Sequence, residues 1–238
     1  MPLRIVLVEP REAGNVGAAA RVMKNFGFDD LWIVGRHPNL NPLAGWWASG
    51  ADDVVERAHF APMLHHAVAD AHITVATTSD RERTTPVDLT PIEVAQLFAT
   101  LSPEQTIALV FGREDKGLTR EEVVQCQHTA VIPTSPSFPT MNLAQSVGVF
   151  CYELSTTSRE PEDRELATAA RIERLHERVQ ALLVEVGFLH GDNPYRVYDE
   201  LRAISARANL DGREATILLG IIRQIEWKLA QAGGDATP

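Results

Sequence analysis

A polar loop framed by two glycines is the first place in this chain where residue types and spacing suggest chemistry. Gly112 and Gly117 enclose Arg-Glu-Asp-Lys, and a glycine at each end lets the backbone turn sharply. Glu114 could therefore face a ligand, or it could be a solvated loop charge, and the pattern alone leaves both interpretations open. A phosphate-binding loop is rejected, because Leu118-Thr119 stands where that motif needs Lys-Ser or Lys-Thr.

A proline-rich loop supplies a second group of polar residues. Pro133, Pro136 and Pro139 exclude a helix or a central strand and predict a stiff connection, which could be its whole role. Met141-Asn142-Leu143 then opens a predicted helix that buries most of its length.

These loops need strands to position them. The apolar run Ile107–Phe111 predicts a central strand covered on both faces, and Ala130–Ile132 predicts the next strand. Thr119 and Glu122 form a capping box that predicts a short helix between the two strands. The sequence therefore predicts an α/β fold with both loops at the carboxyl ends of neighbouring strands, where open sheets bind ligands.

Together these motifs resemble those of the SPOUT methyltransferases. Residues 109–118, with 132–133 and 140–144, are similar to the second and third family motifs, and Gly14–Arg21 is similar to the first. The resemblance implies a parallel sheet whose carboxyl-terminal part threads through itself as a trefoil knot that holds S-adenosylmethionine. General topology rules would not predict such a knot. The resemblance also implies a homodimer in which the knots face each other.

The resemblance assigns roles to individual residues. The catalytic residues it implies are Arg21, Asn15, Glu114, Thr140 and Asn142. The cofactor-binding residues it implies are Thr78, Ser79, Asp80, Gly112, Ile132, Met141, Asn142 and Leu143. Arg21 would stabilise a developing alkoxide or hold the adjacent phosphate, with Asn15 orienting it, although an arginine at this position is usually a solvated helix charge. Thr140 departs from the serine of most relatives, keeping the hydroxyl but adding a methyl group.

The implied reaction is methyl transfer from S-adenosylmethionine to a ribose 2′-hydroxyl of RNA. The carboxyl-terminal stretch, with Gly187-Phe188 and arginines between Arg196 and Arg213, resembles the bacterial tRNA (cytidine/uridine-2′-O)-methyltransferase branch of the family. The favoured substrate is therefore tRNA at the first nucleotide of the anticodon loop, position 32. Two alternatives remain: a ribosomal RNA 2′-O-methyltransferase of the same family, and an RNA-binding relative without turnover.

Length and composition limit the classes of protein to which this chain can belong. With 238 residues, 45% of them hydrophobic, the chain can bury one sizeable core and a small second domain. Its two cysteines offer no disulfide framework, and Cys151 falls in an apolar helix as a buried thiol. We expect a cytoplasmic protein, because we find neither an export signal nor a membrane-spanning run. We expect no metal, because His65, His66 and His72 lack the spacing and companions of a metal site.

The net charge of −10 argues against unselective nucleic-acid binding but not against a local basic patch. Nine cationic residues lie in or near the expected loops, and their charges add if those loops share one edge of the sheet. Scattered solvated charges are the alternative. The nine residues are Arg11, Arg21, Lys24, Arg36, Arg81, Arg83, Arg113, Lys116 and Arg120.

The remaining segments predict the other elements. Strands are expected at 3–8, 31–34 and 73–76, and a helix is expected from an N-cap at Asn15 to Gly27. The segment 38–50 reads as irregular, with Trp46 and Trp47 expected to pack under a loop rather than to stack on unpaired bases.

A change in character near Ser158 divides the chain into a methyltransferase domain, residues 1–157, and a helical carboxyl-terminal extension, residues 158–238. Three helices are expected in the extension, over 164–186, 194–208 and 214–231. The first has Ile172, Leu175, Val179 and Leu182 on one face. The third has Ile217, Leu218, Ile221, Ile222, Ile225 and Leu229 as its apolar residues.

Overall fold

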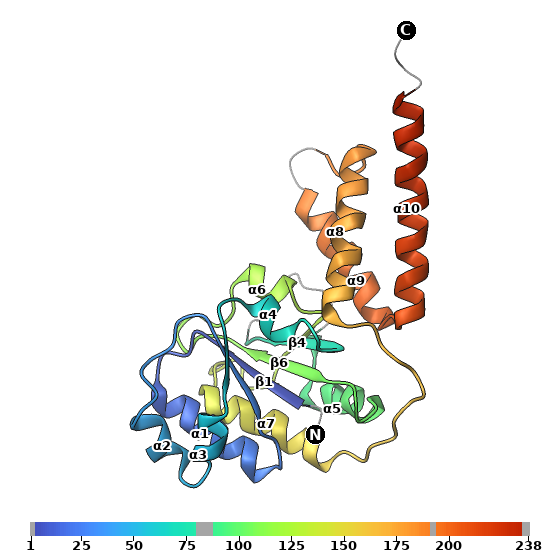
Figure 1. Cartoon of the computed structure of the whole chain (residues 1–238). Helices are drawn as coiled ribbons and strands as arrows, with labels where there is room; N and C mark the ends of the chain where they lie inside the picture. Colours follow the sequence, from blue (N-terminus) through green and yellow to red (C-terminus); the bar gives the residue numbers. More distant parts are fainter. Residues whose placement is uncertain (1–2, 80–87, 191–193, 235–238) are drawn as a thin grey trace.

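The computed structural model describes residues 3–79, 88–190 and 194–234, in which a parallel sheet carries helices on both faces (Figure 1). Seven strands pair in the order β3-β2-β1-β6-β4-β7-β5, and every pairing is parallel. The strands are β1 (Leu3–Val8), β2 (Asp30–Val34), β3 (His59–Ala61), β4 (Ile73–Thr77), β5 (Asp88–Leu89), β6 (Ile107–Phe111) and β7 (His128–Ala130). The α/β class and the central position of β6 are thus confirmed.

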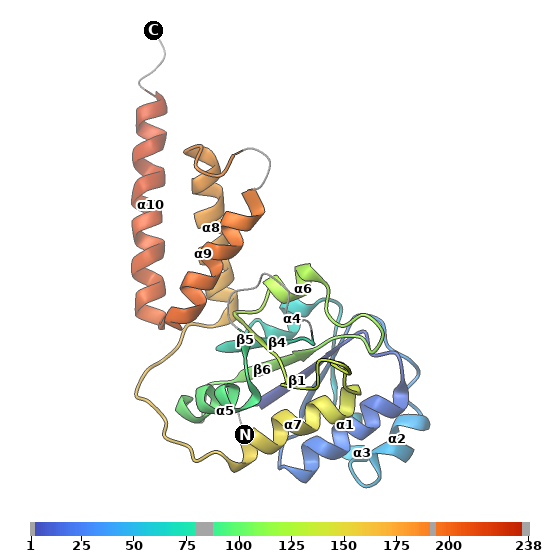
Figure 2. The ribbon, with the colours of Figure 1, turned by 180° about the vertical axis from the view of Figure 1, so that it is seen from behind.

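The helices form two groups. Those around the sheet are α1 (Ala13–Asn25), α2 (Leu43–Ala48), α3 (Asp52–Glu56), α4 (Leu64–Val68), α5 (Pro91–Thr100), α6 (Arg120–Val124) and α7 (Leu143–Thr156). Those of the carboxyl-terminal region are α8 (Ala169–Glu185), α9 (Pro194–Ala208) and α10 (Gly212–Gly234). Figure 2 shows α7 beside α1 beneath the sheet and the second group stacked beyond its other side.

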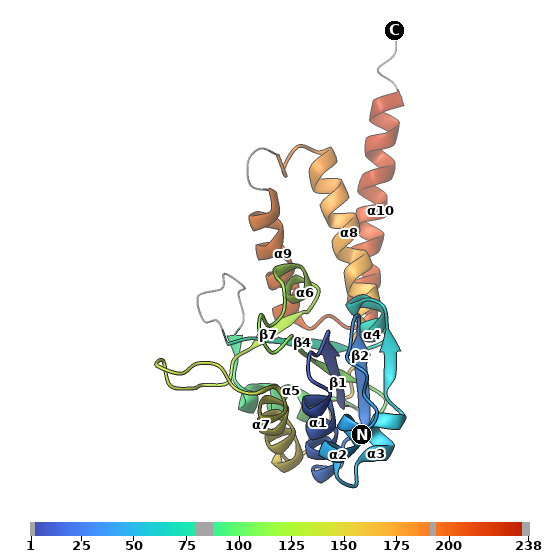
Figure 3. The ribbon, with the colours of Figure 1, turned by 90° about the vertical axis from the view of Figure 1, so that its left-hand side faces the viewer.

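Alternation along the strands builds a core on each face of the sheet. In β1, Leu3, Ile5 and Leu7 point toward α1, α5 and α7, whereas Val6 and Val8 point toward α4 and α6. Both faces are therefore apolar, as a parallel sheet covered on two sides requires. Figure 3 shows the two layers edge-on, with α1 and α7 on one side of the sheet and α4 and α6 on the other.

Three local expectations are wrong in detail. Helix α1 begins at Ala13 with Glu12 as N-cap, so Asn15 lies inside the first turn and does not cap it. The strand expected over 130–132 ends at Ala130 instead, because its partners β4 and β5 end at the paired residues Thr77 and Leu89. The segment expected to be irregular contains α2, and Trp46 and Trp47 on it are 72% and 61% exposed.

The exposure of the two tryptophans has a steric cause. Helix α2 buries Ala44 and Ala48, which are four residues apart on one side. That side lies directly on α1, where a Cβ built at Gly17 would sit 2.0 Å from the carbonyl oxygen of Ala44. Because this close crossing admits only small side chains, Trp46 and Trp47 stay largely exposed, with the ring of Trp47 lying beside Gly14 of α1.

The carboxyl-terminal helices pack partly as expected. Ile172, Leu175 and Leu182 are buried on one face of α8, and Val179 packs beside them. On α10, Ile222 is buried, whereas four of the other apolar residues predicted there are exposed: Ile217, Leu218, Ile221 and Ile225.

Both cysteines are buried in the described residues. Cys126 and Cys151 are buried free thiols, and burial raises the pKa of each to about 12. No group of three or more His, Cys, Asp or Glu side chains in residues 3–79, 88–190 and 194–234 could hold a metal ion. Within the same residues, every helix is too short or too polar to cross a membrane.

His176 should make the protein less stable in acid. It is 6% exposed and its Nε2 lies 2.6 Å from Ser205 Oγ. Burial, helped by the charge of Arg202, lowers the pKa of His176 from 6.5 to about 3. As pH falls below 6.5 the unfolded chain therefore binds a proton before the folded chain does, and stability falls. At pH 5 this residue should lower the free energy of unfolding by about 2 kcal/mol relative to pH 7.

Urea unfolding at pH 5 and pH 7 checks this prediction. His176→Gln should remove most of the fall in the free energy of unfolding that His176 causes between pH 7 and pH 5. His65→Gln, at an exposed histidine of α4, should leave that fall unchanged. An unchanged pH dependence in His176→Gln would contradict the account.

Candidate active site

The carboxyl ends of β4, β6 and β7 meet at one edge of the sheet, and the segments that follow them enclose a pocket of about 260 Å³. Its lining comes from the ends of these strands and the loops after them, at residues 77–79, 111–118, 130, 132, 134 and 139–141, together with one side of α7. Phe111 and Phe150 meet edge to face at 5.8 Å between ring centroids and contribute apolar surface. The expectation that the two loops lie together is confirmed.

Gly112 is where the loop after β6 begins, and no larger residue fits there. A Cβ at this position would lie 2.1 Å from the carbonyl carbon of Gly117 and 2.2 Å from the backbone nitrogen of Leu118. The chain folds back on itself because Arg113 and Gly117 exchange two backbone hydrogen bonds, of 3.2 and 2.8 Å. Gly117 adopts a φ of +65°, which glycine tolerates without strain. Residues 114–116 therefore form the tip of a tight turn.

The side chain of Arg113 holds this turn in place through hydrogen bonds to two carboxylates. Its Nε donates to Glu9 at 2.8 Å, and its two terminal nitrogens donate to the carboxylate of Glu122 at 2.9 Å each. Although burial opposes the charge, the bonds to Glu122 and then Glu9 raise the pKa of Arg113 above its ordinary value. Glu122 also closes the capping box on Thr119, as the sequence predicts. Arg113 is therefore a structural cation rather than part of a free basic patch.

A chain of hydrogen bonds links Asn142, Asn15 and Glu114. The side-chain oxygen of Asn142 accepts from the backbone amides of Ala144 and Gln145 as the N-cap of α7, so its Nδ2 must face outward. That nitrogen donates to Asn15 Oδ1 at 2.9 Å. Asn15 Nδ2 in turn donates to Glu114 Oε1 at 2.9 Å. The orientation of each amide is thus fixed by the next, and three distant segments are held together.

Glu114 is the acceptor at the end of this chain. Its carboxylate also accepts from the backbone amides of Arg11, at 2.8 Å, and Glu12, at 3.2 Å. Burial alone would raise the pKa of Glu114, but the hydrogen bonds from Asn15 and from the backbone lower it below its ordinary value. The carboxylate stays ionised at neutral pH, and it has specific partners rather than being a solvated loop charge.

Arg21 stands apart from these residues. It is exposed on α1, and its side chain makes no hydrogen bond or ion pair within the part of the chain that the structure describes. Six residues separate it from Asn15, which is about 240° around a helix, so the two side chains leave α1 in different directions. The structure therefore does not join Arg21 to the chain of Asn142, Asn15 and Glu114.

Most of the expected cofactor residues line the pocket. Thr78, Ser79, Gly112, Ile132, Met141 and Leu143 are among its walls, as are Glu114 and Thr140. Asn142 is not among the lining residues and acts instead as the cap of α7. Asp80 lies outside the described residues.

Ser146 also lines the pocket, although it was not singled out from the sequence. A sequence signal for it existed, because Ser146 follows Asn142 by four residues and so lies on the same side of the helix.

The cations gathered from the sequence are mostly neutralised. Arg113 pairs with Glu9 and Glu122, Lys24 with Asp53, Arg120 with Asp199, and Arg11 with Asp115. Arg81 and Arg83 lie outside the described residues. In the described part of the chain, Arg21, Arg36 and Lys116 have no ion pair, so the free positive charge is smaller than the sequence suggests.

Comparison with known proteins gives two family matches and several close relatives. Residues 2–152 match the SpoU rRNA Methylase family, and residues 170–235 match the C-terminal domain of tRNA methyltransferase TrmJ. The tRNA (cytidine/uridine-2′-O-)-methyltransferase TrmJ of Escherichia coli (strain K12) is 35% identical over 234 residues, covering 94% of this chain and 95% of that protein.

Solved structures agree with these matches. The crystal structure of TrmJ from Z. mobilis ZM4 superimposes with a TM-score of 0.81 at 31% identity, covering 94% of this chain and 98% of that one. An AdoMet-bound rRNA methyltransferase from Sinorhizobium meliloti, at 20% identity, shares the fold with a TM-score of 0.50 over 64% of this chain and 55% of that one.

Proposed function

The chain belongs to the SpoU methylase family and is an RNA methyltransferase, and we propose that it transfers a methyl group from S-adenosylmethionine to a ribose 2′-hydroxyl of tRNA. The favoured acceptor is a cytidine or uridine at position 32, the first nucleotide of the anticodon loop. The match to the TrmJ C-terminal domain and the 35% identity to TrmJ proteins support tRNA over ribosomal RNA.

The main support for this proposal is that hydrogen bonds connect residues of all three family motifs. Asn15, Asn142 and Glu114 belong to three separate segments, yet two hydrogen bonds of 2.9 Å link them at the edge of the pocket. Such a network fixes the entrance of the site before any ligand arrives.

The pocket has the chemistry that S-adenosylmethionine requires. Gly112 lines the pocket and has no side chain that could cover its backbone groups. Backbone groups of Gly112, Ile132 and Leu143, with the hydroxyls of Ser79, Thr140 and Ser146, provide hydrogen bonds. Phe111, Phe150 and Ile132 offer apolar surface for a purine ring.

Bound there, S-adenosylmethionine would supply an activated methyl group on a sulfonium. The protein must therefore mainly align the acceptor and stabilise the charge that develops on its 2′-oxygen. An arginine is a poor base at its ordinary pKa but a good partner for an alkoxide or a phosphate. We assign this role to Arg21, whose exposed guanidinium has no competing partner in the described residues. Glu114, Asn15 and Asn142 shape the entrance, and Thr140 contributes a hydroxyl at its rim.

The proposal also includes how the chain assembles and how its parts are arranged. Because Arg21 leaves α1 away from the hydrogen-bonded network of its own chain, we propose a homodimer in which a second copy completes each pocket. We also propose that residues after β6 thread as a trefoil knot, which the match to the SpoU rRNA Methylase family supports. Residues 1–157 would form the catalytic domain and residues 158–238 a helical extension.

Transfer of labelled methyl groups tests the proposal. The full chain should label tRNA, with the modified nucleotide mapping to position 32, and should leave ribosomal RNA unlabelled. Label only in ribosomal RNA would keep the chemistry and replace the substrate. Binding of RNA without any label would support the third alternative, an RNA-binding relative without turnover.

A further inference from the structure

Helix α6 connects two parts of the molecule. It begins at Arg120, shortly after the turn that lines the pocket, and its first and last residues contact α9 of the carboxyl-terminal region. Arg120 pairs with Asp199 of α9 at 2.5 Å, and Arg202 of α9 donates to the carbonyl oxygen of Val124 at 2.9 Å. The carboxyl-terminal region therefore contacts α6 at both of its ends.

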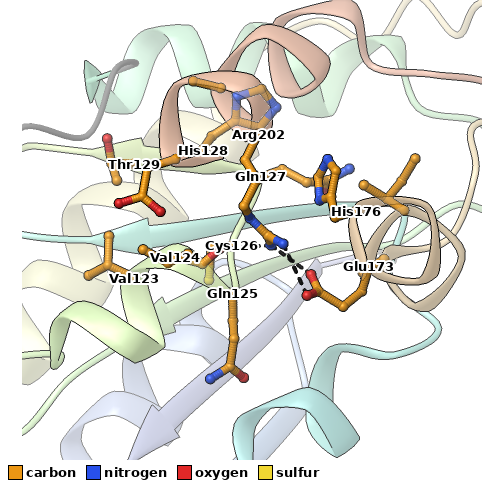
Figure 4. A pocket seen from close by; sticks show the side chains of 14 residues that line it. Val123, Val124, Gln125, Cys126, Gln127, His128, Thr129, Glu173, His176 and Arg202 are labelled. Carbon is orange, nitrogen blue, oxygen red and sulfur yellow. Dashed lines mark hydrogen bonds and ion pairs between the residues drawn. The ribbon is translucent and has the colours of Figure 1, made fainter. Parts of the chain in front are cut away.

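Arg202 is the central residue of this contact. Its side chain is 11% exposed and forms two bonds with the carboxylate of Glu173 on α8, of 3.0 and 2.6 Å (Figure 4). One guanidinium thus joins α8, α9 and the last residue of α6. A lysine could not make these contacts together, because it lacks the planar fork of donors.

Among the described residues, the unpartnered side-chain atoms of the surrounding cavity could not take the place of Arg202. Three buried side-chain atoms lack a partner in the described residues, and all three line this cavity: Gln125 Oε1, His128 Nδ1 and His176 Nδ1. All are acceptors. Ser205 donates its hydroxyl hydrogen to the backbone of Arg202, so His176 donates through Nε2 and its Nδ1 carries no proton. His128 likewise points Nε2 at the oxygen of Asn209. Without Arg202, the carbonyl of Val124 therefore loses its donor.

The inner side of α6 leads to the cofactor pocket. Glu122, the middle residue of this five-residue helix, holds the guanidinium of Arg113 at 2.9 Å. Arg113 in turn donates to the carbonyl of Gly117 at 3.3 Å and forms the wall of the pocket. Any displacement of α6 must therefore shift Glu122, Arg113 and the turn that contains Gly117.

We propose that Arg202 is a positioning residue for the cofactor pocket: by holding α6 against α8 and α9, it keeps the turn of residues 112–117 in the geometry that binds S-adenosylmethionine. The inference rests on the proposed function only in naming the ligand of that pocket. It assigns the carboxyl-terminal helices a role in cofactor binding, although none of their residues lines the pocket.

Calorimetric titration of the full chain with S-adenosylmethionine tests the proposal. Arg202→Ala should raise the Kd at least about fivefold, the lower end of typical coupling between linked sites. Backbone amides of residues 113–124 should also exchange hydrogen faster without the cofactor. The matched control is Arg178→Ala, which removes an ion pair between α8 and α10 that does not touch α6. It should leave the Kd within about twofold.

A double substitution separates positioning from a general loss of stability. Because Glu122→Gln breaks the link between α6 and Arg113, adding Arg202→Ala to it should raise the Kd little further. If Arg202→Ala does not fold, Asp199→Asn weakens the same contact more gently and should raise the Kd in the same direction. An unchanged Kd in the folded variants, or an equal rise in Arg178→Ala, would overturn the inference alone. Failure of the unsubstituted chain to bind would overturn the cofactor assignment and this inference with it.

Discussion

Replacing Arg21 by Ala should reduce methyl transfer to tRNA by roughly two to three orders of magnitude, as expected when a donor that stabilises transition-state charge is lost. The affinity for S-adenosylmethionine should stay near normal, because Arg21 is exposed, lies outside the pocket lining and has no partner in the described residues. Single-turnover transfer of labelled methyl groups and calorimetric titration of the cofactor measure the two quantities separately.

Lys24→Ala is the control for this substitution. Lys24 lies one turn further along α1, but its ammonium already pairs with Asp53 at 2.6 Å and contacts the carbonyl of Gly50. Its removal takes a similar charge from the same helix and should leave the rate largely intact. A fully active Arg21→Ala protein would refute the assigned role, and an equal loss in both variants would indicate a general effect of positive charge on tRNA binding.

Replacing Gly112 by Ala should abolish measurable binding of S-adenosylmethionine, with a loss of affinity of about a hundredfold or more. The added methyl group would meet backbone atoms at 2.1 and 2.2 Å, and backbone at a crossing cannot move aside as a flexible side chain can. The turn that lines the pocket must open to accept it. Calorimetry measures the affinity, and circular dichroism establishes that the sheet remains folded.

Gly220→Ala provides the matched control. This glycine lies within α10, and a Cβ built there meets no atom within 4 Å. Alanine should therefore stabilise that helix by about 0.5–1 kcal/mol and leave the cofactor affinity unchanged. Normal binding by Gly112→Ala would show that the turn can rearrange at little cost, and that the close crossing does not shape the pocket.

Elements that depend on neighbouring residues could be predicted from the sequence alone. Alternating and continuous apolar runs predicted the strands at the centre of the sheet, because burial on both faces leaves its mark within five or six residues. The capping box of Thr119 and Glu122 and the left-handed Gly27 were also predicted, since their hydrogen bonds or backbone angles involve near neighbours. The motifs of the pocket were recognisable for the same reason, as short stretches with fixed spacing.

The contacts that those motifs make could be learned only from the folded chain. Asn15 was expected to cap a helix, but it bridges residues 99 and 127 positions away. Arg113 was counted as a free cation, but Glu122 and Glu9, the second of them 104 positions away, neutralise it. Trp46 and Trp47 were expected to be covered, but the close crossing of α1 and α2 at Gly17 and Ala44 admits only small side chains, and both tryptophans stay largely exposed. In each case the contacts of a polar or bulky side chain depend on which groups folding brings close to it. The energies of those competing contacts depend on distances in space that sequence separation does not encode.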